Sequence, residues 1–214
     1  MTRPNTLFLA VPILAAGLLA IGACSTAQKA DTAGAIEDAD QRARRAVELA
    51  AQADKARLAG DTERAMNLYR ESIEQSPEFA DVWNNLGLLH LEENELDKAL
   101  SAFSMAAELD PADPRPHTNI GITNLRAGWA EYALQDFHKA LTISPSYLPA
   151  LRGAVRAADL LGQAEFEDLD RVRRALLAER DEQWRAYLER QRYLIESRLR
   201  SPRTTPPAGA SATP

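Results

Sequence analysis

The sequence repeats with a period of 34 residues, and this regularity constrains the fold more than any other feature. Blocks 46–79, 80–113 and 114–147 align without an insertion. Positions 8 and 20 of each block are small, position 24 is aromatic and position 32 is proline. In that order the residues are Ala53, Gly87, Gly121; Ala65, Ala99, Ala133; Tyr69, Phe103, Phe137; and Pro77, Pro111, Pro145. Because one such unit cannot bury its own apolar face, the period predicts similar units stacked side by side.

Each block is predicted to form two antiparallel helices. Small residues let the helices approach closely, and the aromatic ring fills the space beside them. Proline at position 32 lacks an amide hydrogen and separates the blocks. Position 15 carries residue types that accept the left-handed backbone of a turn. These are Gly60, Asn94, Gly128 and, one period further, Gly162.

The period and its residue types resemble the tetratricopeptide repeat (TPR), over residues 46 to 162. The resemblance implies an all-α protein, a right-handed α-solenoid of about three helix-turn-helix repeats, a half-repeat and a long C-terminal capping helix. It also implies a function in binding other proteins. The third block departs from the family pattern, with His117 in place of tryptophan and Asn124 in place of tyrosine.

The fourth period begins on pattern and then fails. Leu151, Ala154 and Gly162 fit positions 4, 7 and 15, whereas Glu167 and Arg171 stand at positions 20 and 24. Residues 148–163 are therefore predicted to form a half-repeat helix, and the following stretch to cap the exposed apolar end.

The capping stretch, residues 164–200, is predicted to be one or more arginine-rich amphipathic helices. Residues 171–203 hold ten arginines and five acids in a chain of formal net charge −6. The apolar face, which includes Trp184, Tyr187 and Leu188, either packs on the last repeat or docks a partner or anionic lipid. A break near residues 179–181 would let the stretch fold back on itself. Residues 201–214 are Pro-rich and predicted to be disordered.

The N-terminus predicts export and anchoring. Arg3 precedes an apolar stretch, residues 7–20, that is short for a membrane span. Cys24 follows Ile21-Gly22-Ala23 and is the only cysteine in the chain. The four residues resemble a bacterial lipobox, which implies removal of residues 1–23 and lipidation of Cys24. The alternative is an ordinary signal peptide with an incidental thiol.

Lipidation would anchor the chain to the cell envelope, and Ser25 after the lipidated cysteine is, by resemblance to Gram-negative lipoproteins, compatible with the outer membrane, facing the periplasm. Residues 24–40 are expected to be a flexible tether that turns helical from about Ile36.

Several classes of function are disfavoured by what the sequence contains. The negative charge argues against nucleic acid as the main partner. His90, His117 and His138 show no metal-binding spacing, and no motif for a phosphate, a cofactor or a catalytic nucleophile is found. The expectation is a protein that is not an enzyme and needs no metal or cofactor.

The family resemblance also implies a binding groove. In such repeats, positions 2, 5, 6, 9, 12 and 13 of the first helix face the concave surface. The candidate residues for a protein or peptide partner are Asn84, Asn85, Leu88, Arg115, Asn119, Ile122, Arg126, Arg152 and Arg156. Asn85 and Asn119 could bind the backbone of an extended peptide, or merely support contacts between helices and turns. The four arginines predict a partner with acidic character.

One family subtype holds a terminal carboxylate with lysine, asparagine and arginine at five fixed positions. This chain offers Ala50, Asp54, Asn85, Arg115 and Asn119 there. Two of the five are chemically compatible and Asp54 would repel a carboxylate, so that clamp is not expected.

The sequence thus predicts a membrane-anchored TPR adaptor lipoprotein that holds a protein partner during assembly of a pilus, a secretion system or the outer membrane. Its layout resembles pilotin and Tad-pilus assembly lipoproteins. Two alternatives stay open. One is a structural homo-oligomer paired through the C-terminal helix, and the other is a regulator of a cell-wall enzyme.

Overall fold

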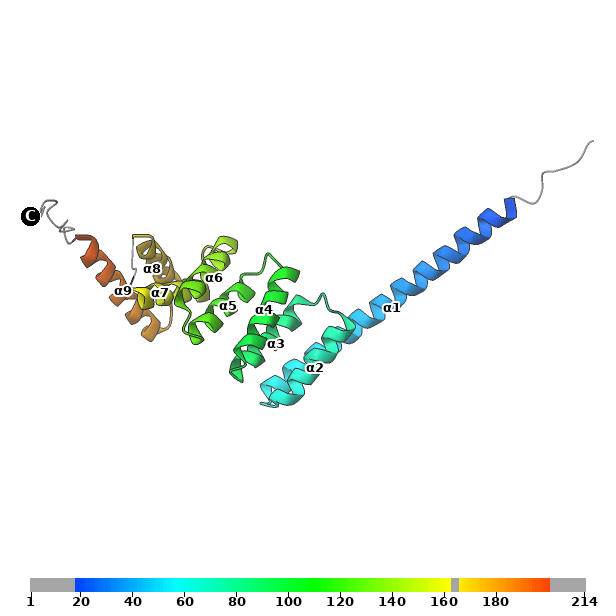
Figure 1. Ribbon diagram of the computed structural model, residues 1–214, viewed down its shortest axis with the longest axis horizontal. Helices are drawn as coiled ribbons and strands as arrows, with labels where there is room; N and C mark the ends of the chain where they lie inside the picture. The colour runs from blue at the N-terminus through cyan, green and yellow to red at the C-terminus, as the bar shows by residue number, and fades with distance from the viewer. Residues whose placement is uncertain (1–17, 163–165, 201–214) are drawn as a thin grey trace, which may run out of the picture. The chain divides into compact units, whose positions relative to one another are not determined.

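The computed structural model describes residues 18–162 and 166–200, and every regular element in these ranges is an α-helix (Figure 1). The chain divides into two units, Met1–Arg45 and Ala46–Pro214, which are described separately. The helices are α1 (Leu18–Leu58), α2 (Thr62–Gln75), α3 (Ala80–Glu92), α4 (Leu96–Leu109), α5 (Pro114–Arg126), α6 (Ala130–Ile143), α7 (Leu148–Leu161), α8 (Phe166–Ala178) and α9 (Glu182–Arg200).

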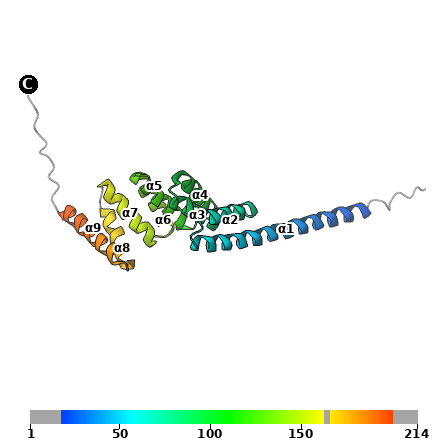
Figure 2. The same ribbon diagram turned by 90° about the horizontal axis from the view of Figure 1, so that it is seen from below.

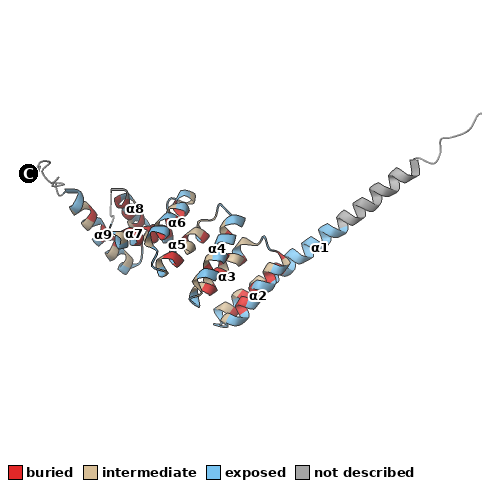
Figure 3. Ribbon diagram, viewed as in Figure 1, coloured by how far each residue is buried: buried red, intermediate tan, exposed pale blue. Residues whose placement is uncertain are grey.

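The first unit contributes the N-terminal part of α1. This differs from the expected flexible tether, because the helix already begins at Leu18 and not near Ile36. The segment is rich in alanine, the strongest helix former, and has a single glycine, Gly34. Every side chain described here, from Gly34 to Arg45, is exposed (Figure 3).

The predicted signal peptide lies largely outside the described residues, and the Cys24 side chain lies outside them as well. In the part of the chain that is described, no helix is both long and apolar enough to cross a bilayer.

The second unit confirms the predicted all-α solenoid. Within it α2 to α9 follow one another as packed neighbours, and the two views agree on this order (Figures 1 and 2). Helix α3 packs on α4, α5 on α6, and α7 on α8, while α3, α5 and α7 also contact one another in sequence. We call α3, α5 and α7 the A helices and α4, α6 and α8 the B helices.

The turns form at the predicted residues. Gly60, Asn94, Gly128 and Gly162 all have positive φ, between 60° and 83°, and Asn94 is the only one of these that is not glycine. Helices α2, α4 and α6 end at Gln75, Leu109 and Ile143, just before the three repeat prolines. Asp113 caps α5 as expected, its Oδ1 accepting a hydrogen bond from the Arg115 amide at 2.9 Å.

The aromatic ring of each B helix lies against a glycine of an A helix. Tyr69, Phe103 and Phe137 are all fully buried. A Cβ at Gly87 would lie 2.6 Å from the Phe103 ring, and one at Gly121 would lie 2.7 Å from the Phe137 ring. The small residues at position 8 therefore make room for the ring, as the pattern predicted.

Asn124, which departs from the family pattern, has a buried partner. Its Nδ2 donates to Asp136 Oδ2 at 2.8 Å, and Asp136 is also bound by Lys139 at 2.8 Å. The neighbouring His117 is half-buried, as expected of a structural histidine, and burial lowers its pKa, with Lys139 acting in the same direction. A polar pair therefore takes the place of an aromatic contact in this repeat.

Helix α8 packs on α7 as a B helix, which the strict 34-residue period concealed. It begins 18 residues after the start of α7, whereas α4 begins 16 residues after α3 and α6 begins 16 after α5. The two extra residues shift Leu169 into the place where the period puts Glu167. Leu169, Val172 and Ala175 are buried in the same core cluster as α6 and α7, so α8 closes the apolar end as predicted.

The capping stretch consists of two helices, not one. Helix α8 ends at Ala178 and α9 begins at Glu182, at the break that the sequence suggested. The apolar face of α9 packs on α8, with Leu188 and Ile195 buried. Of the two interpretations of this face, the structure supports packing within the chain.

Candidate functional site

A continuous groove runs over the A helices and ends at α9. It consists of three adjoining hollows of about 560, 440 and 470 Å³. The first two share Ile122 and Arg126, and the last two share Arg156, Leu160 and Trp184. We call these the α3–α5, central and α9 hollows, after the elements that line them.

Position within the repeat determines which side chains line the groove. The α3–α5 and central hollows are lined by positions 9, 12 and 13 of α3 and α5, and the central and α9 hollows by groove positions of α7. These residues are Leu88, Leu91, Glu92, Ile122, Leu125, Arg126, Pro149, Arg152, Gly153, Arg156, Asp159 and Leu160. Five of the nine predicted candidates, Leu88, Ile122, Arg126, Arg152 and Arg156, are therefore brought together there.

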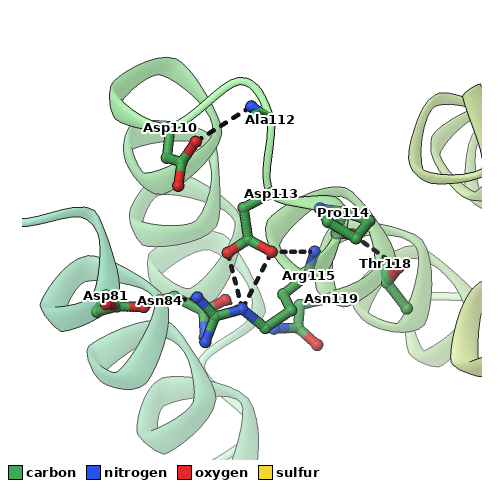
Figure 4. Close-up of polar contacts among 9 residues, drawn as sticks. All are labelled: Asp81, Asn84, Asp110, Ala112, Asp113, Pro114, Arg115, Thr118 and Asn119. Atoms are coloured by element: carbon green, nitrogen blue, oxygen red, sulfur yellow. Dashed lines mark hydrogen bonds and ion pairs between the residues drawn. The ribbon is translucent and has the colours of Figure 1, made fainter. Parts of the chain in front are cut away.

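The other predicted candidates lie at positions 2, 5 and 6, where side chains bind one another across neighbouring A helices. Asn119 Nδ2 donates to Asn84 Oδ1 at 2.8 Å, and Arg115 bonds Asp81 at 2.6 Å and Asp113 at 2.8 Å (Figure 4). These two acids keep the pKa of Arg115 above its usual value, Asp113 contributing more. These contacts hold α3 against α5.

Asn85 and Asn119 thus differ, although they share position 6. The Asn119 amide group is engaged by Asn84, as the structural interpretation of these asparagines foresaw. Asn85 is half-buried, and its side chain has no hydrogen bond to any described residue. Binding of a peptide backbone by Asn85 stays a prediction.

The four arginines predicted for the groove also differ in how they are neutralised. Arg115 and Arg152 are paired with carboxylates. Arg126 Nη1 donates to the uncharged Leu91 carbonyl, and Arg156 has no ion pair to any described residue. Only Arg126 and Arg156 therefore keep an uncompensated charge, so the row of four free cations that the sequence suggested is reduced to two.

Helix α9 supplies the part of the groove that sequence reasoning missed. Gln183, Trp184 and Tyr187 line the α9 hollow, and Trp184 also lines the central one. Counting from Glu182 as position 1, Leu188 and Gln191 fall at positions 7 and 10 and are buried, like Leu86 and Leu89 of α3. Helix α9 thus takes the place of a further A helix, a relation hidden by the insertion before α8.

An ion pair fixes α9 at the end of the groove. Glu179, at the break between α8 and α9, is buried and accepts a hydrogen bond from Arg152 Nε at 2.6 Å and a second from Nη2. Its Oε1 also accepts from the Arg180 and Asp181 amides, at 2.9 and 2.8 Å. The Arg152 guanidinium, followed by these amides, lowers the pKa of Glu179 against the opposing effect of desolvation.

Aromatic contacts complete the α9 end. The Arg152 guanidinium carbon lies 5.0 Å from the centroid of the Trp184 ring, and this ring packs edge-to-face on Tyr187 at 5.6 Å. The Tyr187 hydroxyl donates to Asp159 Oδ2 at 3.0 Å. Burial and the Asp159 charge raise the pKa of Tyr187.

The arrangement suits recognition of an extended or helical segment. The groove is lined mainly by apolar side chains with a few placed charges, which is how ligand and peptide grooves are built. Among the side chains that the structure describes, no three histidines, cysteines or acids are grouped so as to hold a metal ion.

Comparisons with known proteins support the fold. The family model "Tetratricopeptide repeat" matches residues 50–114. The human protein O-mannosyl-transferase TMTC3 is 24% identical over 149 residues, which cover 64% of this chain and 16% of that protein. The chain thus spans about a sixth of that relative.

Among solved structures, a crystal structure of MamA protein is similar with a TM-score of 0.59 at 15% identity, covering 72% of this chain and 86% of that one. The first TPR of Spaghetti (RPAP3), bound to the HSP90 peptide SRMEEVD, has a TM-score of 0.54 at 17% identity and covers 56% of this chain and 95% of that one. From the period, the turns and these matches together, residues 46–200 form a solenoid of tetratricopeptide repeats.

Proposed function

We propose that this chain is a membrane-anchored TPR adaptor of the bacterial cell envelope, which captures a protein partner in the groove over α3, α5, α7 and α9 and has no catalytic role. The observation that carries the proposal is the groove itself. Its apolar side chains recur at positions 9, 12 and 13 of successive A helices and are not covered by any described part of the chain.

The anchoring part of the proposal rests on the sequence. Cys24 follows Ile21-Gly22-Ala23 at the end of an apolar stretch, and lipidation there would place the repeats at the envelope membrane. Ser25 suits the outer membrane, with the groove facing the periplasm. There the adaptor would hold a component of a pilus, a secretion system or the outer membrane during assembly.

Burial of the α9 apolar face favours an adaptor over a homo-oligomer paired through this helix. Leu188 and Ile195 are used in packing on α8, and Gln191 between them is buried as well. Less apolar surface is then left for pairing between copies.

Two measurements test the proposal in a Gram-negative host. Labelling with a palmitate analogue should mark the full chain and not Cys24→Ser, and the variant should leave the membrane fraction. In cross-linked cells, Ile122→Ser with Leu160→Ser should lose its captured partner, because both side chains are exposed in the groove. The matched control is Leu177→Ser, an exposed leucine on α8 outside the three hollows. Capture by all three proteins to the same extent would contradict a role for the groove.

A further inference from the structure

The central hollow is the part of the groove with the most specific chemistry. It holds about 440 Å³, within the roughly 300–1,000 Å³ typical of ligand pockets. Its lining contains three arginines, Arg126, Arg152 and Arg156, and no aspartate or glutamate. Its other lining residues are apolar: Ile122, Leu125, Phe137, Pro149, Gly153, Leu160 and Trp184.

Two of these arginines carry charge that the protein does not neutralise. Arg152 is balanced by the buried Glu179. Arg126 binds only an uncharged carbonyl, and Arg156 has no carboxylate partner among the described residues. The hollow therefore presents two uncompensated positive charges in a chain whose formal net charge is −6.

The apolar lining between these charges is open to solvent. Ile122 is 41% exposed and Leu160 is 65% exposed. Gly153 has no side chain here, and a Cβ at this position would lie 2.3 Å from the Phe137 ring. The hollow thus combines uncovered apolar surface with unpaired cations, and a partner can bury the first only if it also satisfies the second.

We infer that the central hollow binds a peptide segment of the partner that carries a large apolar side chain next to acidic residues. The apolar side chain lies against Ile122, Leu160 and Trp184, and the carboxylates lie against Arg126 and Arg156. This inference rests on the proposed function of the groove and specifies the chemistry of its ligand.

The carboxylates on either side of the hollow agree with this assignment. Glu92 lines the α3–α5 hollow and Asp159 lines the α9 hollow, where Asp159 accepts a hydrogen bond from Tyr187. An acidic segment is therefore attracted to the central hollow and repelled by Glu92, which favours one register along the groove. The hollow differs from a clamp for a terminal carboxylate, since it is built from α5, α7 and α9 and has no lysine.

The test uses the purified full chain and a library of random peptides displayed on phage. Peptides that bind should be enriched in Glu or Asp beside Leu, Phe, Trp or Met. A selected peptide, made synthetically and labelled, should bind Arg126→Gln with Arg156→Gln about 2- to 30-fold more weakly, the effect expected of two exposed ion pairs. The control is Arg64→Gln with Arg70→Gln, which removes the same charge from exposed positions on α2 and should bind like the original chain.

Salt gives a second readout. Raising the ionic strength should weaken binding of the selected peptide to the original chain and to the α2 control, and should have a smaller effect on the groove variant. Equal loss in both double variants would overturn the inference, because the effect would then come from net charge alone. Recovery of no binders would also overturn it.

One outcome separates this inference from the proposed function. Peptides that lose binding in Ile122→Ser with Leu160→Ser but show no enrichment in acids would contradict the inference and leave the groove as the binding site. If neither the library nor the cross-linked cells show dependence on the groove, both fail.

Discussion

Replacing Gly153 by alanine tests whether the groove floor is packed as described. Gly153 is a helical residue of α7, and a Cβ there would lie 2.3 Å from two ring atoms of Phe137. The ring cannot simply move away, because Gly121 of α5 contacts it as well and its own Cβ would lie 2.7 Å from the ring. Phe137 is fully buried and so has no exposed space to turn into.

The magnitude follows from two opposing effects. Overpacking a well-packed core destabilises by about 1–3 kcal/mol, and the short contact places this case near the upper value. Alanine in a helix interior recovers about 1 kcal/mol relative to glycine. The net destabilisation should be about 2 kcal/mol, which lowers Tm by roughly 4–8 °C for a domain of this size.

Thermal unfolding followed by circular dichroism measures the effect, and two further variants identify its cause. Gly34→Ala, where a Cβ meets nothing within 4 Å, should not lower Tm. Phe137→Leu should destabilise on its own, but adding Gly153→Ala to it should cost much less than in the original chain. If Gly153→Ala leaves Tm unchanged or raises it, the packing of Phe137 between α5 and α7 is wrong.

Three further predictions concern packing and charge. Ala99→Leu should destabilise by about 1–3 kcal/mol, measured by urea unfolding, because Ala99 is fully buried between helices; an unchanged midpoint would mean that the repeat register is wrong. Glu179→Gln should destabilise by about 1–3 kcal/mol and make α9 more sensitive to protease than Glu182→Gln does. Since the pKa of Glu179 is lowered in the fold, its stabilisation is present above the unfolded pKa of about 4.3 and is lost as the pH falls through the lower folded pKa; stability that does not differ between the two proteins at pH 6 would refute this. The pKa of Tyr69 is raised to about 12 by burial and then by Asp54, so its contribution is present below pH 10 and is lost as the pH rises through 12; ultraviolet titration that finds Tyr69 ionising near 10 would contradict the buried contact.

Much of the fold could be predicted because the repeat imposes it locally. The left-handed turns at Gly60, Asn94, Gly128 and Gly162 follow from residue type, and the fully buried rings at Tyr69, Phe103 and Phe137 follow from the period. What failed was arithmetic over distance. Two extra residues before α8 moved its apolar face off the fixed period, so a helix with a buried face was read as off pattern.

The candidate site was predictable in position and less so in chemistry. Repeat offsets placed Leu88, Ile122 and Arg156 in the groove correctly. They could not show that Asn119 would bind Asn84, or that Arg115 would be neutralised by Asp81, because those partners come from a neighbouring repeat at a distance of about one period. Trp184 was seen only as part of an amphipathic face, since its place in the groove depends on how α8 and α9 fold back.

Photocrosslinking in living cells tests the groove most directly. A light-activated amino acid would replace Leu88, Ile122 or Leu160 in the groove, or Ser104 or Gln135, which are exposed on the B helices α4 and α6. The account predicts that the same protein is cross-linked from the three groove positions and not from the two B-helix positions. Cross-links to that protein from α4 and α6, with none from the groove, would contradict it.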